Sequence, residues 1–279
     1  RLGPEVTIMC CVGDEPSGEK LLEPLRAAGI HLDHVAVHNG VSSGVGHVTL
    51  EVMEHTAQNR IVVIPGANQT LKLEEISWLR EEIGSYDLVL LQLEIPIEVN
   101  RTVARWAKEA GVPVMLNPAP ATELDDELLS LVSWLIPNEQ EASMETHLPL
   151  RTDAEGPLKS DLRNIAAKLW DKGVEHIVIT LGGHGAVVVK ADGLTYIPCV
   201  SMRHVADPTA AGDSFVGALA VGVTLGLSHA QALEFAAYTA ALTVSRMGAM
   251  PSLPTLEEVL TLMRERGCQA PARLDVLKA

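Results

Sequence analysis

The chain has 279 residues, of which 47% are hydrophobic and only 3% are aromatic, and its formal net charge is −15. This length allows a large core without disulfides or structural metals. The negative charge argues against nucleic acid or an anionic membrane as the main partner, although a local nest of backbone N–H groups could still hold a phosphate.

The cysteines and the apolar runs indicate the compartment. Cys10 and Cys11 lie in an apolar run typical of buried thiols, and no C-x-x-C pair occurs in the chain. We recognise no signal peptide, and the longest apolar runs, about ten residues, are too short to span a bilayer. We therefore expect a cytoplasmic protein.

The N-terminal part of the chain is expected to be rich in strands. An apolar run predicts a buried strand over 6–12, and apolar residues at helical spacing predict a helix over 18–28 that ends at Gly29. Alternating and β-branched residues predict three antiparallel strands, over 34–38, 47–53 and 60–64.

From residue 71 onward, helices and strands alternate. The expected helices cover 73–83, 99–110, 126–132 and 162–172, and the expected strands cover 87–91, 113–116, 134–136 and 176–180. Such alternation implies βαβ crossovers and a mostly parallel sheet, so the fold class is α/β. A hairpin of strands over 186–190 and 195–200, turning at Asp192-Gly193, comes next, and helices over 211–225, 229–246 and 256–266 follow it. The polar stretch 151–160 is expected to be a surface loop.

Compact polar residues follow the expected strands. In an open parallel sheet ligands bind at the carboxyl ends of the strands, so these residues are candidates for a site. They are Gln92, Glu94, Asn117, Asn138, Glu139, Glu141, Thr180, Gly182, Gly185, Asp207 and Asp213.

The stretch at 207–215, D-P-T-A-A-G-D-S-F, comes just before a long apolar segment. Ala210, Ala211 and Gly212 add no bulk, and the free N–H groups at the first turn of the following helix would attract an anion. The Asp213 carboxylate would repel that anion, which makes sense if it accepts a proton from a hydroxyl that attacks a phosphate. The alternative is that Asp213 is the N-cap of an ordinary helix.

Two further segments allow both a binding and a structural interpretation. Asn138 and Glu141 share one helix face and could hold a hydrated Mg²⁺, or they could form a capping box at a helix start. The glycines in T-L-G-G-H-G at 180–185 would allow close approach of a nucleotide, or they could form a hairpin loop. Neither G-x-G-x-x-G nor a Walker A motif is present, which argues against a dinucleotide-dependent oxidoreductase.

Two polar positions remain open in the same way. Glu94 could hydrogen-bond sugar hydroxyls or be an ordinary surface residue. Carbonyls of the loop 246–252 and the Ser252 hydroxyl, together with Asp207, could surround a monovalent cation, whereas the alternative is a helix C-cap at Gly248. The histidines form no metal-ligand pattern.

Together these segments resemble the ribokinase family of carbohydrate kinases. The segment D-P-T-A-A-G-D-S-F-V-G-A-L-A at 207–220 is similar to the family's C-terminal signature. Further similar segments are P-G-A-N at 65–68, L-Q-L-E at 91–94, N-P-A-P-A at 117–121, P-N-E-Q-E at 137–141, I-T-L-G-G-H-G at 179–185 and G-A-M-P-S at 248–252. The resemblance implies a ribokinase-like fold over 1–279 as one catalytic domain, with a mostly parallel central sheet flanked by helices and a small β-strand lid at about 44–64.

The resemblance also implies an activity and its residues. It implies ATP-dependent phosphorylation of D-ribose at O5, giving ribose 5-phosphate and ADP, with Mg²⁺ and K⁺ as cofactors and a homodimer in the full-length form. Asp213 would be the general base and would contact the sugar together with Glu94, and the N–H groups around Ala210, Ala211, Gly212 and Asp213 would form the anion hole. The residues around the nucleotide and its magnesium would be Asn138, Glu141, Thr180, Gly182, Gly183, His184, Gly185 and Gly212. The residues around potassium, largely through backbone carbonyls, would be Asp207, Thr209, Thr243, Arg246, Gly248 and Ser252.

The chain departs from the family at its start. Members begin with a strand that carries a sugar-binding Asp, then lid strands, and then a G-G-K-G-A-N-type segment that opens a helix, whereas Arg1-Leu2-Gly3 matches the end of that helix. We therefore expect the N-terminal strand and part of the lid to be missing. The alternatives to a ribose kinase are a kinase of deoxyribose, fructose or adenosine, and a non-catalytic nucleotide- or sugar-binding remnant.

Overall fold

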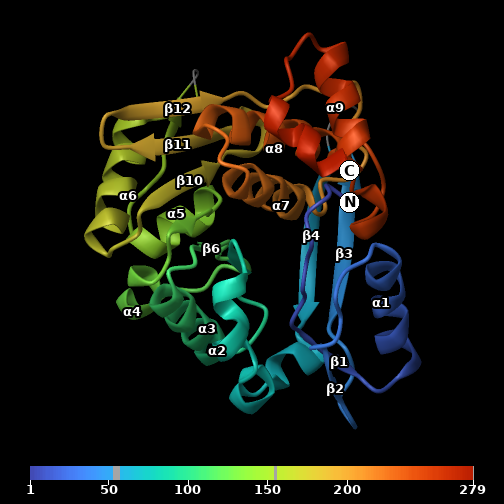
Figure 1. The fold of residues 1–279 in the computed structure, drawn as a ribbon. Helices are drawn as coiled ribbons and strands as arrows, with labels where there is room; N and C mark the ends of the chain where they lie inside the picture. The colour runs from blue at the N-terminus through green and yellow to red at the C-terminus, as the bar shows by residue number, and fades with distance from the viewer. Residues whose placement is uncertain (53–56, 154–155, 279) are drawn as a thin grey trace.

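The computed structural model describes residues 1–52, 57–153 and 156–278 (Figure 1). The helices of this described part are α1 (Pro16–Ala27), α2 (Leu79–Glu82), α3 (Ile97–Ala110), α4 (Asp126–Ser130), α5 (Glu139–Thr146), α6 (Lys159–Asp171), α7 (Ala211–Thr224), α8 (His229–Val244) and α9 (Leu256–Glu265). The strands are β1 (Cys11–Gly13), β2 (Ala36–His38), β3 (Val45–Val52), β4 (Ala57–Ile64), β5 (Val89–Leu91), β6 (Val114–Leu116), β7 (Trp134–Leu135), β8 (Thr152–Asp153), β9 (Gly156–Pro157), β10 (His176–Thr180), β11 (Ala186–Lys190) and β12 (Gly193–Ile197).

Six strands form the central sheet, in the order β12-β11-β10-β7-β6-β5. The strands β5, β6, β7 and β10 run parallel, and β11 and β12 extend the sheet as antiparallel neighbours. The register places Leu91, Leu116 and Leu135 side by side, so the carboxyl ends of β5, β6 and β7 meet at one edge. The expected α/β class with a mostly parallel sheet is confirmed.

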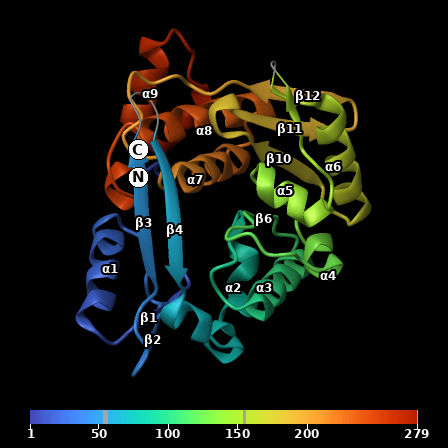
Figure 2. The ribbon, with the colours of Figure 1, turned by 180° about the vertical axis from the view of Figure 1, so that it is seen from behind.

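Helices cover both faces of this sheet, as the two opposite views show (Figures 1 and 2). Val103 of α3 and Leu162 of α6 are buried on one face, and Leu219 of α7 and Phe235 of α8 are buried on the other. Because aromatic residues are few, aliphatic side chains fill most of both layers. Each such large side chain contributes about 1.5–3 kcal/mol when it leaves water.

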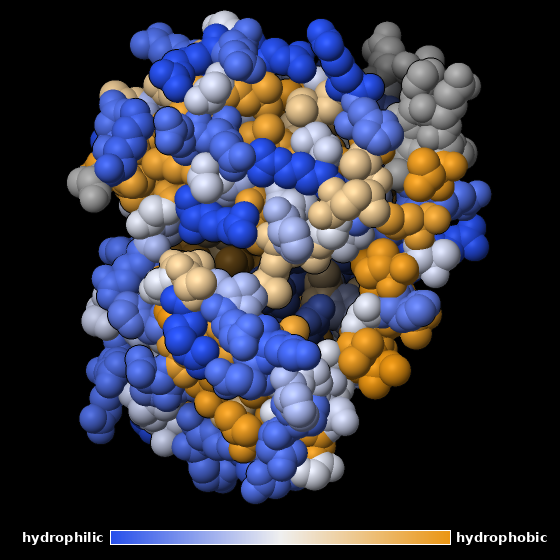
Figure 3. Space-filling view, turned by 90° about the vertical axis from the view of Figure 1, so that its right-hand side faces the viewer, coloured by the Kyte–Doolittle hydropathy of each residue, from blue (hydrophilic) through white to orange (hydrophobic). Residues whose placement is uncertain are grey.

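A long hairpin, β3–β4, stands beside the central sheet in both views (Figures 1 and 2). Its register pairs Val45 with Ile64 and Leu50 with Asn59, and successive residues point to opposite faces. Large apolar side chains on both faces are exposed: Val45, Val48, Val52, Ile61, Val62, Val63 and Ile64. Figure 3 shows apolar side chains gathered along one edge of the molecular face that it draws. Because a two-stranded hairpin alone is marginally stable, this hairpin depends on contacts outside itself.

The N-terminal part differs from the expectation in two ways. The expected strand over 6–12 forms a ladder only at β1, while Thr7 makes a single bridge with His31. The expected antiparallel direction of the strand over 34–38 is wrong, since β2 pairs with β1 in parallel. The helix α1 carries the chain back between β1 and β2, as a parallel pair requires.

The expected helix over 73–83 is also wrong. It is broken into the 3₁₀ turn Leu73–Ile76, the helix α2 and the 3₁₀ turn Ile83–Ser85. The Ser77 hydroxyl donates to the Glu74 carbonyl at 2.8 Å, which competes with a continuous helix ladder.

The remaining elements lie within a few residues of their expected places. The strand over 176–180 coincides with β10, and the expected hairpin is present as β11–β12. It turns one residue earlier than expected, at Ala191-Asp192, because Gly193 already pairs with Lys190. Met53, the last residue of the strand expected over 47–53, lies outside the described residues. In the expected loop 151–160, residues 154–155 are also outside them, and the described part forms the β8–β9 pair. Among the described residues, no helix has the length and apolar character needed to cross a membrane.

Candidate active site

Three of the polar residues predicted from strand ends, Asn117, Asn138 and Thr180, lie together at one edge of the sheet. Asn138 and Thr180 form a bridge between the ends of β7 and β10, and the Thr180 N–H donates to the Pro137 carbonyl at 3.0 Å. The buried Asn117 side chain donates through Nδ2 to the Ile136 carbonyl at 2.9 Å, so it ties two strand ends together. The Asn117 side chain therefore stabilises the edge of the sheet and does not face a ligand.

Asn138 and Glu141 form the capping box at the start of α5. The Asn138 Oδ1 atom accepts from the N–H groups of Gln140 and Glu141, both at 2.9 Å, and Glu141 Oε2 accepts from the Asn138 N–H at 2.8 Å. Burial raises the pKa of Glu141, and the hydrogen bond from the Asn138 backbone opposes that shift. The structural interpretation is thus realised, which leaves only Asn138 Nδ2 and Glu141 Oε1 to face a ligand.

The glycine-rich turn at 180–185 links β10 to β11, so it is also the hairpin loop of the structural alternative. A Cβ atom at exposed Gly182 or Gly183 would meet nothing within 4 Å. Gly185 differs, because its φ is +90° and a Cβ there would lie 2.1 Å from the Ile197 carbonyl oxygen. The first two glycines leave open space beside the sheet edge, while Gly185 is required by the backbone of the hairpin.

The N-terminus of α7 offers free backbone donors. Its N-cap is Ala210, held in the left-handed region at φ 62°, and the Ala211 N–H donates to the Pro208 carbonyl at 3.2 Å. Among the described residues, the N–H groups of Gly212 and Asp213 have no partner. The alternative that Asp213 is an N-cap is wrong, since it occupies the third helical position. Of the expected anion-hole donors, Ala211 is already engaged.

Two carboxylates lie close together beside this helix terminus. Burial raises the pKa of Asp213. The pKa of Glu94 is raised first by burial and then by the negative charge of Asp213. Asp213 comes from the start of α7 and Glu94 from the end of β5, so tertiary structure brings together two groups that are far apart in the sequence.

The Asp207 carboxylate joins the two loops of the expected cation site. Its Oδ1 atom accepts from the Thr209 N–H and its Oδ2 atom accepts from the Gly248 N–H, both at 2.9 Å. Burial disfavours the charged form, but the hydrogen bonds from Thr209 and Gly248 prevail and lower the pKa of Asp207. The N-terminus of α7 is therefore fixed to the chain that follows α8.

Side chains of the other expected cation-site residues are engaged within the chain. Thr243 donates to the Thr239 carbonyl at 3.1 Å, and Ser252 donates to the Ala249 carbonyl at 2.6 Å. The Arg246 guanidinium is itself a cation and pairs with Glu258 of α9 at 2.7 Å, so Arg246 could contact a bound cation only through its carbonyl. The alternative of a C-cap at Gly248 is wrong, because α8 ends at Val244.

These residues fit the Mg²⁺ and K⁺ ions that the resemblance implies, and they offer backbone atoms more than side chains as ligands. The described residues contain no cluster of three His, Cys, Asp or Glu side chains suited to a metal. A divalent cation here would therefore rest on phosphate oxygens and water, with Glu141 near them, as Mg²⁺ commonly does. A monovalent cation would rest on carbonyls of the loops that Asp207 joins.

A cavity of about 340 Å³ also reaches Asp213. It lies between the N-terminal residues, α1 and α7, and apolar side chains such as Leu2, Leu25 and Leu253 line it. A sugar needs hydrogen-bond partners for its hydroxyls, so this apolar cavity does not suit one. The side of Asp213 that faces Glu94 is polar, so it suits a sugar better.

Two contacts near the site were missed from the sequence. The Asn59 side chain of β4 donates to the Thr209 hydroxyl at 3.1 Å, and the Gln69 side chain donates to the Glu94 carbonyl at 3.1 Å. Neither residue follows a strand of the central sheet, so the strand-end rule could not find them. Asn59 stands between polar Gln58 and Arg60 in the sequence, so no local pattern distinguished it.

Comparison with known proteins identifies the family. Residues 1–256 match the family described as pfkB family carbohydrate kinase. The chain belongs to this family. In this member of the pfkB family, the free N–H groups of α7 and the carboxylate of Asp213 lie within one helical turn.

Individual relatives agree with this membership. The chain is 35% identical over 259 residues to a ribokinase of Schizosaccharomyces pombe, covering 91% of this chain and 78% of that protein. It is 30% identical over 259 residues to a deoxyribokinase of Salmonella typhi, covering 92% and 81%. Among solved structures, Arabidopsis thaliana ribokinase complexed with ribose and ATP superposes with a TM-score of 0.80 at 31% identity, covering 93% of this chain and 82% of that one. The ribokinase-like fold expected from the sequence is confirmed.

Proposed function

We propose that this chain is an ATP-dependent kinase that transfers the γ-phosphoryl group to O5 of D-ribose, giving ribose 5-phosphate and ADP. One observation carries the proposal: the N–H groups of Gly212 and Asp213 lack partners within the described chain, and the Asp213 carboxylate lies in the same turn with a raised pKa. Free donors suit a phosphate, and a carboxylate beside them suits a proton acceptor. The named ribokinases among the relatives support the substrate.

The chain's own residues would act mainly by position and charge. Asp213 accepts the proton from the attacking hydroxyl, which its raised pKa favours because the carboxylate is then a stronger base. The N–H groups of Gly212 and Asp213 donate to the phosphoryl oxygens as negative charge develops on them. Glu94 orients the sugar through its hydroxyls.

The nucleotide and cations take the surrounding positions. We place the nucleotide along Thr180, Gly182, Gly183, His184 and Gly185, because open space adjoins this turn at Gly182 and Gly183. Bound Mg²⁺ would neutralise charge on the phosphates, with Asn138 and Glu141 near it. Bound K⁺ would rest on carbonyls of Asp207, Thr209, Thr243, Arg246, Gly248 and Ser252, and so hold the α7 terminus in place.

Deoxyribose is the second candidate acceptor, because a deoxyribokinase is among the relatives at 30% identity. The test is ADP release from ATP–Mg²⁺ with ribose, 2-deoxyribose, fructose, adenosine or no acceptor, each in K⁺ and in Na⁺. Turnover that requires ribose and rises in K⁺ supports the proposal. Higher kcat/KM for deoxyribose would reassign the substrate, and nucleotide binding without turnover on any acceptor would overturn the kinase proposal for this chain.

We also propose that the β3–β4 hairpin acts as a lid and as the homodimer contact. One face carries Asn59 toward α7, while the opposite face presents exposed Val45, Val62 and Ile64. Exposed apolar strands of this kind favour pairing with a second copy. On this proposal residues 1–279 act as one cytoplasmic catalytic domain. Analytical sedimentation should show a dimer of the unchanged chain and a monomer of the Val62→Lys variant.

A further inference from the structure

A largely buried hydrogen-bond network surrounds His38, the last residue of β2. The His38 Nε2 atom lies 2.6 Å from Glu75 Oε1, and its Nδ1 atom lies 2.6 Å from the Thr70 hydroxyl. The side chains of His38 and Glu75 are only 18% and 30% exposed, so water competes little for these contacts. None of the candidate site residues belongs to this network.

The partners of His38 determine where its protons lie. The Thr70 hydroxyl has one proton, which it donates to the Ala67 carbonyl at 2.7 Å. The hydroxyl oxygen therefore accepts from His38 Nδ1, while the Glu75 carboxylate accepts from His38 Nε2. Only an imidazolium donates through both ring nitrogens. These hydrogen bonds therefore require a positively charged His38.

Charged groups around the ring favour this form. Burial by itself would raise the pKa of Glu75, but the hydrogen bonds from His38 and from the Lys72 backbone prevail and lower it. The Lys72 side chain adds a positive charge that acts in the same direction on Glu75. From β1, burial raises the pKa of the Cys11 thiol, which lies 3.9 Å from the Thr70 hydroxyl, so this neighbour is uncharged. The ionised carboxylate at hydrogen-bond distance stabilises the positive ring.

The contact with His38 anchors the end of the 3₁₀ turn Gly66–Thr70. The start of the same turn is anchored by the backbone, because the Ala67 N–H donates to the Ser42 carbonyl at 2.9 Å. The hydroxyl of Thr70 closes the turn onto Ala67 and also accepts from the ring. The position of the turn thus depends on the network.

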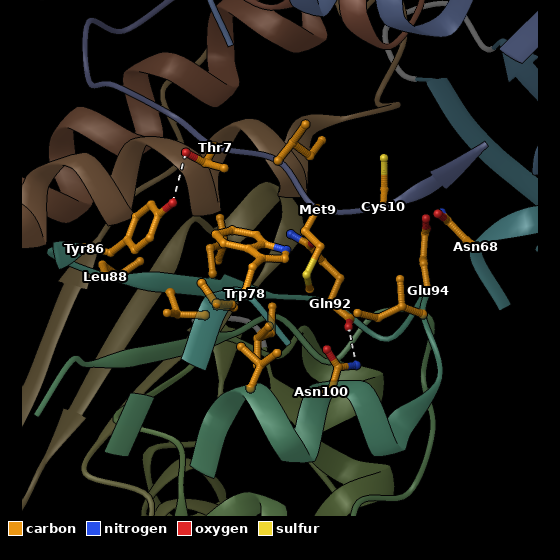
Figure 4. A pocket seen from close by; sticks show the side chains of 17 residues that line it. Thr7, Met9, Cys10, Asn68, Trp78, Tyr86, Leu88, Gln92, Glu94 and Asn100 are labelled. Carbon is orange, nitrogen blue, oxygen red and sulfur yellow. Dashed lines mark hydrogen bonds between the residues drawn. The ribbon is translucent and has the colours of Figure 1, made fainter. Parts of the chain in front are cut away.

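Two residues of this turn reach Glu94, which we propose to orient the sugar. The Gln69 side chain donates to the Glu94 carbonyl at 3.1 Å. Asn68, whose Oδ1 accepts from the Cys11 N–H at 3.0 Å, lines the same cavity as Glu94. Figure 4 shows the side chains of Asn68 and Glu94 pointing toward each other. A shift of the turn would therefore move Glu94 or change its surroundings.

We propose that His38 is a positioning residue for sugar binding: its imidazolium joins Glu75 to Thr70 and so fixes the turn that holds Glu94. His38 acts through Thr70 and Gln69, so its effect on the sugar is indirect. The consequence for the sugar rests on the proposed kinase function, whereas the network and its protonation do not.

Nitrogen NMR of the intact chain at pH 7 tests the network without any substrate. Both His38 ring nitrogens should be protonated, and one should lose its proton in Glu75→Gln, because the carboxylate that stabilises the charge is gone. In His38→Phe, which keeps a flat ring and loses both hydrogen bonds, the Gln69 side-chain amide signals should shift toward those of a solvated glutamine. An unprotonated His38 nitrogen in the unchanged chain, or unchanged Gln69 signals in His38→Phe, would overturn the inference.

Kinetics with ribose tests the consequence for the sugar. His38→Phe and Gln69→Ala should each raise the KM for ribose about tenfold and leave kcat and the KM for ATP almost unchanged, because both act through Glu94. The double variant should be no worse than the larger single effect, since both changes break the same connection. His31→Phe is the matched control. His31 pairs with Glu5 at 2.9 Å outside this network, so this variant should keep the KM of the unchanged chain.

The two measurements separate the possible failures. In an active enzyme, an unchanged KM for ribose in His38→Phe, or full additivity with Gln69→Ala, would overturn the positioning role alone. A fall in kcat as large as the rise in KM would also overturn it, because a general loss of structure lowers both. Should His38→Phe fail to fold, Glu75→Gln keeps the size of the side chain and should raise the KM about threefold. Absence of turnover with every acceptor would instead overturn the proposed function and the sugar role with it, whereas the NMR result would stand.

Discussion

The amide of Asn59 on strand β4 donates a hydrogen bond of 3.1 Å to the hydroxyl of Thr209, 150 residues further along the chain. Thr209 is also held by Asp207 and comes one residue before the N-cap of α7. The hairpin is thereby connected to the loop that leads into α7 and its free N–H groups. Hairpin position and the geometry of the α7 terminus are coupled through this contact.

Asn59→Ala should lower kcat/KM for the sugar about tenfold and leave the KM for ATP almost unchanged. The reason is the loss of the hydrogen bond that holds the hairpin against Thr209. Gln58→Ala, an exposed neighbour on the other face, is the matched control and should have no effect. Combining Asn59→Ala with Thr209→Val should cost no more than the larger single effect. Full additivity in that double-mutant cycle would show that the two residues act separately.

Asp213→Asn should reduce kcat by about a thousandfold, since an amide cannot accept the proton, while ATP affinity changes little. Steady-state kinetics together with nucleotide titration measures both quantities. In the unchanged enzyme, kcat/KM should fall in acid with a midpoint above 3.8, because the raised pKa of Asp213 means that protonation removes the base at a higher pH than for an ordinary aspartate. An acid limb at or below 3.8 would contradict the assignment of Asp213 as the base.

Gly185→Ala should destabilise the fold by about 3 kcal/mol, through unfavourable backbone conformation and contact with the Ile197 carbonyl. Gly183→Ala is the control in the same turn, because its Cβ would meet nothing within 4 Å. Urea unfolding of both variants measures the difference. Equal stability of the two would mean that the hairpin relaxes to accept a side chain at 185.

Arg246→Met should lower stability at neutral pH by less than about 1 kcal/mol, because the ion pair with Glu258 is partly exposed to water. The Arg246 guanidinium is the largest cause that lowers the pKa of Glu258 to about 2. The unfolded value is near 4.5, so the stabilisation is complete above that pH and is lost as pH falls toward 2. Urea unfolding of both proteins at pH 7 and pH 2.5 should show the difference shrink in acid. A difference that grew in acid would rule out the ion pair as its source.

The sequence alone determined the class of fold and most of the candidate residues. Alternation of apolar segments with helical and strand spacing predicts a parallel sheet, and polar residues after the strands, such as Glu94 and Asn138, indicate which edge is the candidate site. These are local signals, since side-chain periodicity and the rule for strand ends depend only on neighbouring residues. The stretch around Asp213 was recognisable for the same reason.

Only the tertiary structure decided which of these groups act on one another. Three contacts depend on how distant elements pack. The charge of Asp213 raises the pKa of Glu94, the Asp207 carboxylate accepts from the Gly248 N–H, and the Asn59 side chain donates to Thr209. The direction of β2 was equally beyond the sequence, because the same extended segment can pair on either side and in either direction. Long-range pairing is set by the burial of whole elements against each other, and no local pattern specifies it.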